Sequence, residues 1–292
     1  MKFGVMFSNT GAYAHPEHAA ALAVAAEDCG LESIWAIEHV VVPNGYESEY
    51  PYHDSGQMPF SKDMDLPDPL VWLAYVAALT SRIQLATGIL IVPQRNPVVL
   101  AKEVATLARL SNGRFHLGIG VGWLEEEFNM LGVPFERRGA RTDEMIAAMQ
   151  ELWSSESHST FHGEFYDFDE IYMRPQPPGQ NVPIIVGGHS TPAAKRAGRY
   201  GDGFFPGGGD IDALVEVREQ MRGYAIDAGR DPDAIEFTAG VWSPRRDSID
   251  EVKRLAELGF DRLIVSPPSS NPDAIRQAME ELGEKIAPVA TH

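Results

Sequence analysis

The chain has 292 residues, of which 44% are hydrophobic, and this composition excludes a disordered protein. Its formal charge of −18 comes without a basic stripe, so no nucleic-acid partner is expected. No apolar run reaches the roughly 18 residues that span a bilayer, and the N-terminal segment has no signal-peptide pattern, so we expect no membrane partner. The single cysteine, Cys29, excludes a disulfide framework and is typical of a cytoplasmic protein.

Short apolar runs alternate with amphipathic stretches along the whole chain. The apolar runs predict strands over Lys2–Phe7, Ser33–Ile37, Ile83–Ile91, Phe115–Ile119, Pro183–Gly187, Gly203–Pro206, Ile235–Val241 and Arg262–Ser266. The amphipathic stretches predict helices over His15–Cys29, Asp68–Thr80, Pro97–Leu110, Arg138–Trp153, Pro192–Tyr200, Asp210–Ala228, Ser248–Leu258 and Pro272–Ile286. Eight strand–helix repeats predict an α/β fold, a (β/α)8 TIM barrel, formed by residues 1–292 as one domain.

Several helix starts carry capping residues. Asp68, Asn96, Thr191 and Asn271 each precede a proline, which predicts an N-cap followed by proline at the first helical position. Asp210 is a further predicted N-cap.

Two segments interrupt the regular spacing. Residues Val40–Pro67 follow the second strand, are rich in Pro, Gly, Tyr, Asp and Ser, and have no helical period. Because this loop leaves the carboxyl end of a strand, we expect it to cover the barrel mouth as a lid. Residues Ser154–Gln180 carry alternating aromatic residues, which predict a short hairpin inserted before the fifth strand.

The second strand ends in IWAIEHV, which places Glu38 and His39 at the mouth, where barrel enzymes carry their active sites. A histidine titrates near neutrality and a carboxylate can fix its tautomer, so the pair could act as a general acid and base. His39 could equally be a hydrogen-bonded residue without a chemical role.

Glycines gather at three other strand ends. Gly88 interrupts the third strand, which indicates a bulge or a close backbone approach. Gly118, Gly120 and Gly122 alternate along the fourth strand before Trp123, so they either leave space for a flat ring or serve interior packing.

The fifth strand runs into GGHST and a helix. Gly187, Gly188 and Ser190 precede this helix and make an anion site possible, because backbone amides and the helix dipole both favour a phosphate. A plainly capped helix is the alternative.

Four segments together resemble the bacterial luciferase-like family, in particular its deazaflavin-dependent oxidoreductases: ESIWAIEHV, ATGILIVPQRNPVVLAKEVATLARLSNGRFHLGIGVGW, ERRGARTDEMI and PIIVGGHSTPAAKRAGRYGDGFF. The resemblance covers most of the chain. It implies a non-prolyl cis peptide at Gly88–Ile89 that supports the cofactor ring, with His39 as the acid or base and Glu38 as an acidic cofactor contact. The cofactor contacts implied are Glu38, His39, Thr87, Gly88, Ile89, Gly120, Val121, Gly122, Trp123, Gly187, Gly188, His189 and Ser190.

Two departures from the family pattern concern the substrate. The sugar-phosphate dehydrogenases of this branch place a glutamate where this chain has Trp123, and a lysine with hydroxyls where it has Gly207, Gly208, Gly209 and Asp210. A carboxylate at a phosphate position is repulsive. We therefore expect a small apolar or aromatic substrate in contact with Phe7, Trp123 and Tyr46.

The leading hypothesis is hydride transfer with coenzyme F420, a deazaflavin, with His39 and Glu38 as catalytic residues. A monooxygenase that uses reduced FMN and dioxygen is the alternative, and a non-catalytic flavin or deazaflavin carrier is the third. Metal ligation is not expected, because the histidines do not gather at strand ends. The resemblance further implies a homodimer, and a separate cofactor reductase is a possible partner.

Overall fold

The computed structural model describes residues 1–208, 210–242, 248–269 and 271–291. Parallel strands form a closed barrel in which β1 pairs with both β2 and β11, and β3 pairs with β5. In barrel order the strands are β1 (Lys2–Val5), β2 (Ser33–Ala36), β3 (Gln84–Thr87), β5 (Phe115–Gly120), β8 (Ile184–Gly187), β9 (Gly203–Phe205), β10 (Glu236–Trp242) and β11 (Arg262–Val265). The expected (β/α)8 barrel is therefore confirmed.

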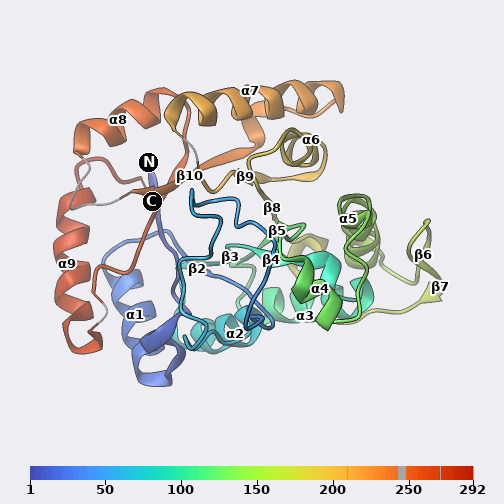
Figure 1. The fold of residues 1–292 in the computed structure, drawn as a ribbon, viewed down its shortest axis with the longest axis horizontal. Helices are drawn as coiled ribbons and strands as arrows, with labels where there is room; N and C mark the ends of the chain where they lie inside the picture. Colours follow the sequence, from blue (N-terminus) through green and yellow to red (C-terminus); the bar gives the residue numbers. More distant parts are fainter. Residues whose placement is uncertain (209, 243–247, 270, 292) are drawn as a thin grey trace.

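Helices surround the barrel (Figure 1), with α7 and α8 along one side and α1 and α2 along the opposite side. Each expected helix is present, with the bounds as predicted for α3 and within three residues of the prediction for the others: α1 (Pro16–Asp28), α2 (Pro69–Leu79), α3 (Pro97–Leu110), α5 (Arg138–Ser154), α6 (Thr191–Tyr200), α7 (Ile211–Asp227), α8 (Ile249–Glu257) and α9 (Ile275–Ile286). Short 3-10 turns lie at η1 (Gly11–Ala14), η2 (Val92–Gln94), η3 (Pro178–Gln180), η4 (Pro232–Ala234) and η5 (Pro272–Ala274). None of the helices in the described ranges is long and apolar enough to span a membrane.

Three of the predicted N-caps are confirmed. The carboxylate of Asp68 accepts a hydrogen bond from the Val71 amide at 3.0 Å, and Asp210 accepts one from the Ala213 amide at 2.8 Å. Asn96 accepts from the first free amides of α3. These caps fix the start of each helix next to a strand end.

The prediction for Thr191 is wrong, and that for Asn271 is right for a shorter element than expected. Ser190, not Thr191, caps α6, and its hydroxyl accepts a hydrogen bond from the Ala193 amide at 3.4 Å. Asn271 caps the 3-10 turn η5 and not α9: its side-chain oxygen accepts a hydrogen bond from the Asp273 amide at 3.1 Å, and α9 begins only at Ile275. In α6, Pro192 occupies the second helical position and not the first. Its missing N–H costs no hydrogen bond at either position, because the first amides of a helix have no partner within it, and this explains the one-residue error.

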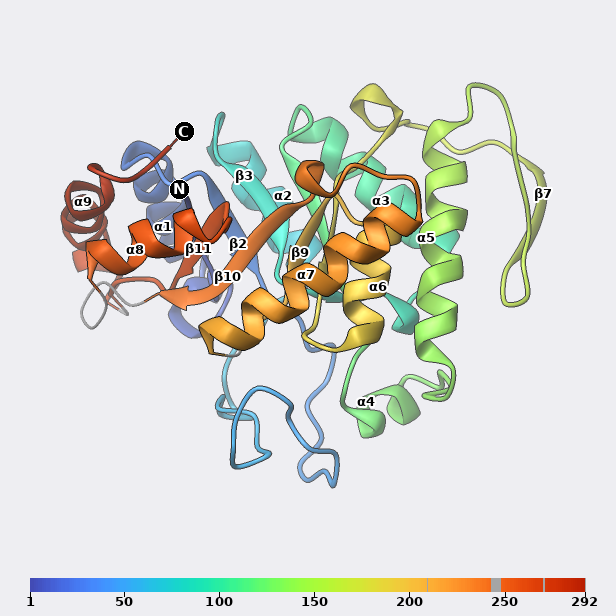
Figure 2. The same cartoon turned by 90° about the horizontal axis from the view of Figure 1, so that it is seen from above.

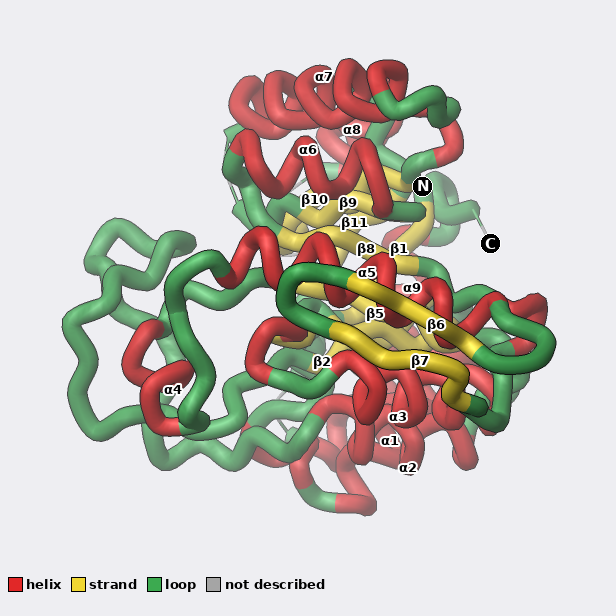
Figure 3. The backbone as a smooth tube through the Cα atoms, turned by 90° about the vertical axis from the view of Figure 1, so that its right-hand side faces the viewer, coloured by secondary structure: helices red, strands yellow, loops and turns green. Residues whose placement is uncertain are grey.

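The predicted third strand is divided into two shorter strands, β3 and a separate β4 (Leu90–Ile91). The peptide bond between Gly88 and Ile89, which lie between them, is cis. The cis bond that the resemblance implied is therefore confirmed. The inserted hairpin is also confirmed: β6 (Ser159–His162) and β7 (Asp167–Ile171) pair antiparallel and lie outside the barrel near α5 (Figure 3).

The barrel interior is packed with side chains. Its apolar layer below the mouth consists of Met6, Trp35, Ile37, Ala86, Ile185, Phe205 and Ile264. A larger apolar core fills the space between the strands and the surrounding helices. At the amino-terminal ends of the strands, the buried Arg262 forms ion pairs with Glu32 and Glu236. Charged groups at this face of a barrel serve stability.

The lid and one unexpected helix lie at the same end of the barrel (Figure 2). Residues Val40–Pro67 contain no helix or strand, as expected, and follow the carboxyl end of β2. Helix α4 (Glu125–Met130), which follows β5, was not predicted. With six residues it is too short for a helical period to be recognised.

Candidate active site

His39 lies just beyond the carboxyl end of β2, and its partner comes from α4. Nδ1 of His39 is 3.2 Å from Oε2 of Glu127, whose other oxygen accepts a hydrogen bond from the Val40 amide at 2.6 Å. Burial opposes the charged form of Glu127, but the hydrogen bonds from His39 and the Val41 amide outweigh it and hold the pKa of Glu127 below its ordinary value. An ionised Glu127 accepts the Nδ1 proton and assigns Nε2 as the basic nitrogen of His39.

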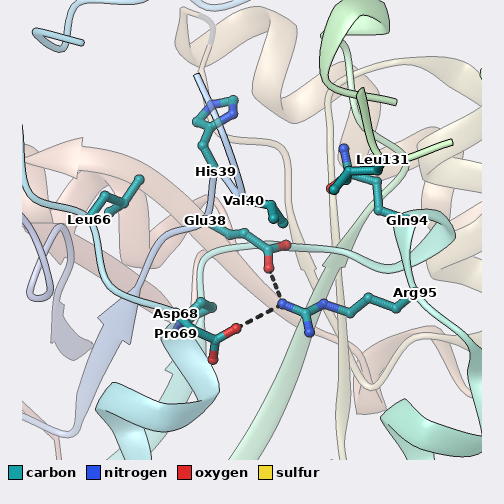
Figure 4. Close-up of a pocket in the computed structure, with 9 residues that line it drawn as sticks. All are labelled: Glu38, His39, Val40, Leu66, Asp68, Pro69, Gln94, Arg95 and Leu131. Atoms are coloured by element: carbon teal, nitrogen blue, oxygen red, sulfur yellow. Dashed lines mark hydrogen bonds and ion pairs between the residues drawn. The ribbon is translucent and has the colours of Figure 1, made fainter. Parts of the chain in front are cut away.

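Glu38 points away from His39 (Figure 4). Its carboxylate forms an ion pair with Arg95 and accepts a hydrogen bond from the Ile91 amide at 2.7 Å. Burial raises the pKa of Glu38, and the ion pair only partly offsets that effect. Arg95 also contacts Asp68 at 3.0 Å. The expected Glu38–His39 pair is therefore corrected: Glu127 holds His39, because successive residues of an extended chain point in opposite directions.

A cavity of about 270 Å³ lies beside these groups. Its walls carry Glu38, His39, Val40, Leu66, Asp68, Pro69, Gln94, Arg95 and Leu131 (Figure 4). His39 thus borders a cavity lined by both charged and apolar side chains.

The alternating glycines make room for protein atoms. A Cβ at Gly118 would lie 1.8 Å from the carbonyl oxygen of Thr87, and one at Gly120 would lie 2.2 Å from the side chain of Ile89. A Cβ at Gly122 would meet Phe128 at 2.6 Å. Neighbouring protein atoms therefore occupy the places where side chains would lie at Gly118, Gly120 and Gly122, as the packing interpretation predicts.

Ile89, which follows the cis bond, lies between two glycine-containing strand ends. Besides its contact at Gly120, its side chain would be 2.9 Å from a Cβ at Gly187. The Thr87 hydroxyl donates to the Gly118 carbonyl at 2.7 Å and ties the same strands together. Val121 is half-buried at the end of β5. The structure therefore brings Thr87, Gly88, Ile89, Gly120 and Gly187 together at one side of the mouth.

The loop from Gly187 to Ser190 leads into α6. Gly188 has φ +105°, which favours glycine, and its amide donates to the Phe205 carbonyl at 3.2 Å. The Ser190 hydroxyl is engaged as the N-cap, whereas His189 is exposed. One amide and one hydroxyl of the predicted phosphate loop therefore already have protein partners.

Aromatic lid residues pack onto Trp123. The ring centroids of Tyr50 and Tyr46 lie 5.2 Å and 5.5 Å from that of Trp123, and His39 approaches the same ring at 6.0 Å. Trp123, His39 and the lid therefore meet in one aromatic cluster.

A second set of contacts extends this cluster across the mouth. The ring centroids of Tyr52 and His189 lie 5.3 Å apart, and a Cβ at Gly207 would be 2.8 Å from the Tyr52 ring. Burial raises the pKa of Tyr52 to about 12. Phe7 and the lid residue Phe60 lie 5.5 Å apart. Of the loop after β9, Gly209 lies outside the described residues.

Helix α4 also anchors the middle of the lid. Glu126 accepts hydrogen bonds from the Glu47 amide at 2.6 Å and from the Ser48 hydroxyl at 2.7 Å. Adjacent glutamates of one short helix therefore hold the lid and orient His39. The sequence did carry a signal for them, because three consecutive glutamates follow Trp123 and Leu124, just after the glycine-rich end of β5. Within the described part of the chain, no group of three His, Cys, Asp or Glu residues is arranged to hold a metal.

Comparison with known proteins gives one consistent family. The model of the luciferase-like monooxygenase family matches residues 1–290. Uncharacterized protein Rv0940c of Mycobacterium tuberculosis is 35% identical over 255 residues, which are 86% of each chain. F420-dependent glucose-6-phosphate dehydrogenase of Kineococcus radiotolerans is 39% identical over 195 residues, which are 65% of this chain and 52% of that protein.

A solved structure has the same fold over nearly the whole chain. The F420-dependent secondary alcohol dehydrogenase in complex with an F420–acetone adduct aligns with a TM-score of 0.79 and 20% identity, and covers 99% of both chains. The family model and the sequence relatives, together with this fold, place the chain in the luciferase-like monooxygenase family.

Proposed function

We propose that this protein is an oxidoreductase that binds coenzyme F420 and transfers a hydride between the deazaflavin and a small apolar or aromatic organic substrate. The observation that carries the proposal is the hydrogen bond of 3.2 Å between His39 and Glu127 at the barrel mouth. This bond provides a histidine with a defined basic nitrogen beneath an aromatic lid. The F420-dependent relatives support the choice of cofactor.

The residues at the mouth fit a flat, partly polar cofactor. A ring system needs an apolar wall with a few polar groups, and Ile89, Val121 and Trp123 offer such a wall beside the backbone of two glycine-containing loops. The glycine loop and the amino terminus of α6 would suit a phosphate. The residues proposed to hold the cofactor are Glu38, His39, Thr87, Gly88, Ile89, Gly120, Val121, Gly122, Trp123, Gly187, Gly188, His189 and Ser190.

When bound, the deazaflavin supplies or accepts the hydride. His39 moves the accompanying proton at Nε2, and the Glu127 carboxylate holds the ring by its Nδ1 proton. The role of Glu38 is to hold the Ile91 amide and Arg95 next to the cis bond. This role replaces the acid–base role that the sequence suggested for it.

The lid excludes water and shapes the substrate site. Because Tyr46 and Tyr50 lie against Trp123, the cofactor or substrate must displace part of this cluster on entry. Phe7, Trp123 and Tyr46 would then contact the substrate. A sugar phosphate is disfavoured, because Tyr52 covers Gly207 and the carboxylate of Asp210 caps α7 in the same loop.

The test is a titration of the cofactor-free protein with coenzyme F420 and, separately, with FMN, both followed by fluorescence. We expect saturable binding of F420 and a turnover that His39→Ala reduces about 10²–10⁴-fold, with a far smaller effect on F420 binding. Tight binding of FMN with no response to F420 would instead identify the second candidate, a reduced-FMN monooxygenase, which the family name favours. Unchanged turnover in His39→Ala would remove the assigned role of His39 and favour a carrier.

We also propose that the protein acts in the cytoplasm as a homodimer and receives its reduced cofactor from a separate reductase. Sedimentation equilibrium tests the dimer, and a monomer across the concentration range would contradict it.

A further inference from the structure

A second cavity, of about 590 Å³, lies on the outer side of the barrel. It is bounded by the turn between β4 and α3, the segment that precedes α5, the first turn of α5 and the tip of the β6–β7 hairpin. Gln94 and Arg95 line both this cavity and the 270 Å³ cavity beside His39. The two cavities therefore share a wall, and the lining of the larger one includes none of the residues proposed to hold the cofactor.

Buried polar atoms without partners concentrate around this cavity. In the described part of the chain, five buried side-chain nitrogen or oxygen atoms have no hydrogen-bond partner, and four of them belong to Gln94, Arg95 and Arg141. All three residues line the larger cavity. The Gln94 amide helps to lower the pKa of Glu127, but no pair of their atoms reaches hydrogen-bond geometry. Unpaired buried polar atoms are costly, so their concentration indicates a place where a ligand supplies the missing partners.

Arg141 adds a buried positive charge. Arg141 is only 8% exposed, and its terminal nitrogens donate hydrogen bonds to the carbonyl groups of Pro134 and Glu136. Among the described residues it forms no ion pair, whereas Arg95 is paired with Glu38 and Arg137 with Glu164. A buried guanidinium without a counter-ion favours an anion beside it.

The start of α5 increases this preference for an anion. Arg137 at this start lines the cavity. Asn96 lines it too, but its side chain already caps the amides of α3. Arg137 has φ 56° and provides no side-chain cap for the 17-residue helix α5. The first amides of α5 and its dipole therefore favour negative charge at this end. Glu136 is the acidic residue in the lining, and its backbone carbonyl is already bonded to Arg141.

The opposite wall is aromatic and held in place. Phe165 and Tyr166, at the hairpin tip, line the cavity, and both of their amides donate to Glu144 of α5 at 2.7 Å. A Cβ at Gly163 would lie 2.1 Å from the same carboxylate, so the tip packs tightly on α5. The cavity thus combines a cationic wall with a preformed aromatic wall.

We propose that this cavity is a second ligand site, which binds a small organic anion with an aromatic or apolar body and a carboxylate head. The head lies against Arg141 and Gln94, and the body lies against Phe165 and Tyr166. This site is separate from the proposed cofactor site, so its test needs no cofactor.

The test is a titration of the cofactor-free full-length protein with 4-fluorobenzoate, followed by fluorine NMR. The neutral 4-fluorobenzyl alcohol is the matched probe. We expect saturable binding of the benzoate, at least about tenfold tighter than the alcohol, because charge-assisted hydrogen bonds are the strong ones. Arg141→Met should weaken benzoate binding at least about tenfold, while Arg109→Met, on the exposed surface of α3, should leave it unchanged.

Two further variants keep the outcome interpretable. Phe165→Glu leaves the carbonyl contacts of Arg141 intact, places a carboxylate in the cavity and should abolish benzoate binding even if Arg141→Met does not fold. Trp123→Ala alters the barrel mouth and should leave the titration unchanged. The proposal is overturned if no saturable binding occurs, if both probes bind equally, or if Trp123→Ala abolishes binding while Phe165→Glu does not.

Discussion

Nδ1 of His39 lies 3.2 Å from Oε2 of Glu127, although the two residues are 88 positions apart in the chain. The loop after β2 supplies the histidine, and α4 after β5 supplies the carboxylate. Their contact couples two functions, because the same carboxylate also accepts the amides of Val40 and Val41 at the start of the lid. The Glu127 carboxylate thus both orients the proposed base and holds the start of the lid.

Glu127→Gln tests this coupling. The amide oxygen of glutamine can still accept from Val40, but its NH₂ group would then face Nδ1 of His39 and favour the opposite tautomer. We expect turnover to fall about 10–100-fold, a typical effect of losing the group that orients a functional histidine, with F420 affinity little changed. Single-turnover kinetics and a binding titration separate the two effects.

Glu125→Gln is the matched control, since this residue belongs to the same helix and is exposed. Its turnover should equal that of the wild type. An equal loss in both variants would mean that α4 as a whole, and not the His39 contact, is responsible.

Local patterns predicted the barrel well, because each strand and helix depends on residues near in sequence. The strand at Ile83–Ile91 was nevertheless wrong in its centre, where the cis bond at Gly88–Ile89 divides it. Thr191 was assigned as a cap because it precedes proline, yet the hydroxyl of Ser190 reaches the free amide. Such errors of one or two residues arise where side-chain geometry, and not periodicity, determines where a strand or helix begins or ends.

The site was less accessible to sequence reasoning. Adjacency suggested that Glu38 would pair with His39, but only the closed barrel brings Glu127 to His39 and Arg95 to Glu38. The side chain of Ile89 likewise occupies the space beside Gly120, which belongs to a neighbouring strand. Contacts between distant segments are set by tertiary packing, which one sequence does not encode locally.

Acid should release the lid from α4. The pKa of Glu126 is lowered from 4.5 to about 2, because hydrogen bonds from Glu47 and Ser48 to its carboxylate outweigh the opposing effect of burial. Since the folded-state pKa is depressed, the anchoring is complete above pH 4.5 and is lost as the pH falls toward 2. NMR of the Glu47 and Ser48 amides between these limits should report one shared transition.

At neutral pH, Glu126→Gln should raise the hydrogen-exchange rates of these two amides roughly fivefold, as expected for the loss of about 1 kcal/mol from charge-assisted hydrogen bonds. Amides of β1, which do not contact α4, provide the internal reference. Unchanged exchange at Glu47 would show that the lid is held by other contacts.

The ionic cluster at the other end of the barrel should contribute to stability and not to activity. Arg262 is 1% exposed and donates to Glu32 at 2.7 Å and 2.8 Å and to Glu236 at 2.8 Å. Arg262→Met removes the cation that Glu32 and Glu236 share and leaves the largely buried Glu32 without its ion pair, while Glu236 keeps Lys2, so we expect a loss of about 3–5 kcal/mol in the free energy of unfolding. Urea denaturation at pH 7 measures it, with Arg82→Met, an exposed residue, as the control.

The same cluster predicts a pH dependence. Burial opposes the charged forms of Glu32 and Glu236, but Arg262 outweighs it and lowers both pKa values below 4.5. Their contribution is therefore full above pH 4.5 and declines as the pH falls below it. The difference between wild type and Arg262→Met should shrink over the same range; a constant difference would exclude these carboxylates as its source.

Two glycine-to-alanine changes should have opposite effects on stability. A Cβ at Gly118 would lie 1.8 Å from the Thr87 carbonyl oxygen, so Gly118→Ala must push β3 and β5 apart and should cost about 1–3 kcal/mol or more. At Gly223, inside α7, a Cβ would meet nothing within 4 Å, and alanine there should stabilise the protein by about 0.5–1 kcal/mol. Urea unfolding of both variants measures the contrast. A Gly118→Ala protein as stable as Gly223→Ala would mean that the two strands can separate freely, and the packing account of the fourth strand's glycines would then fail.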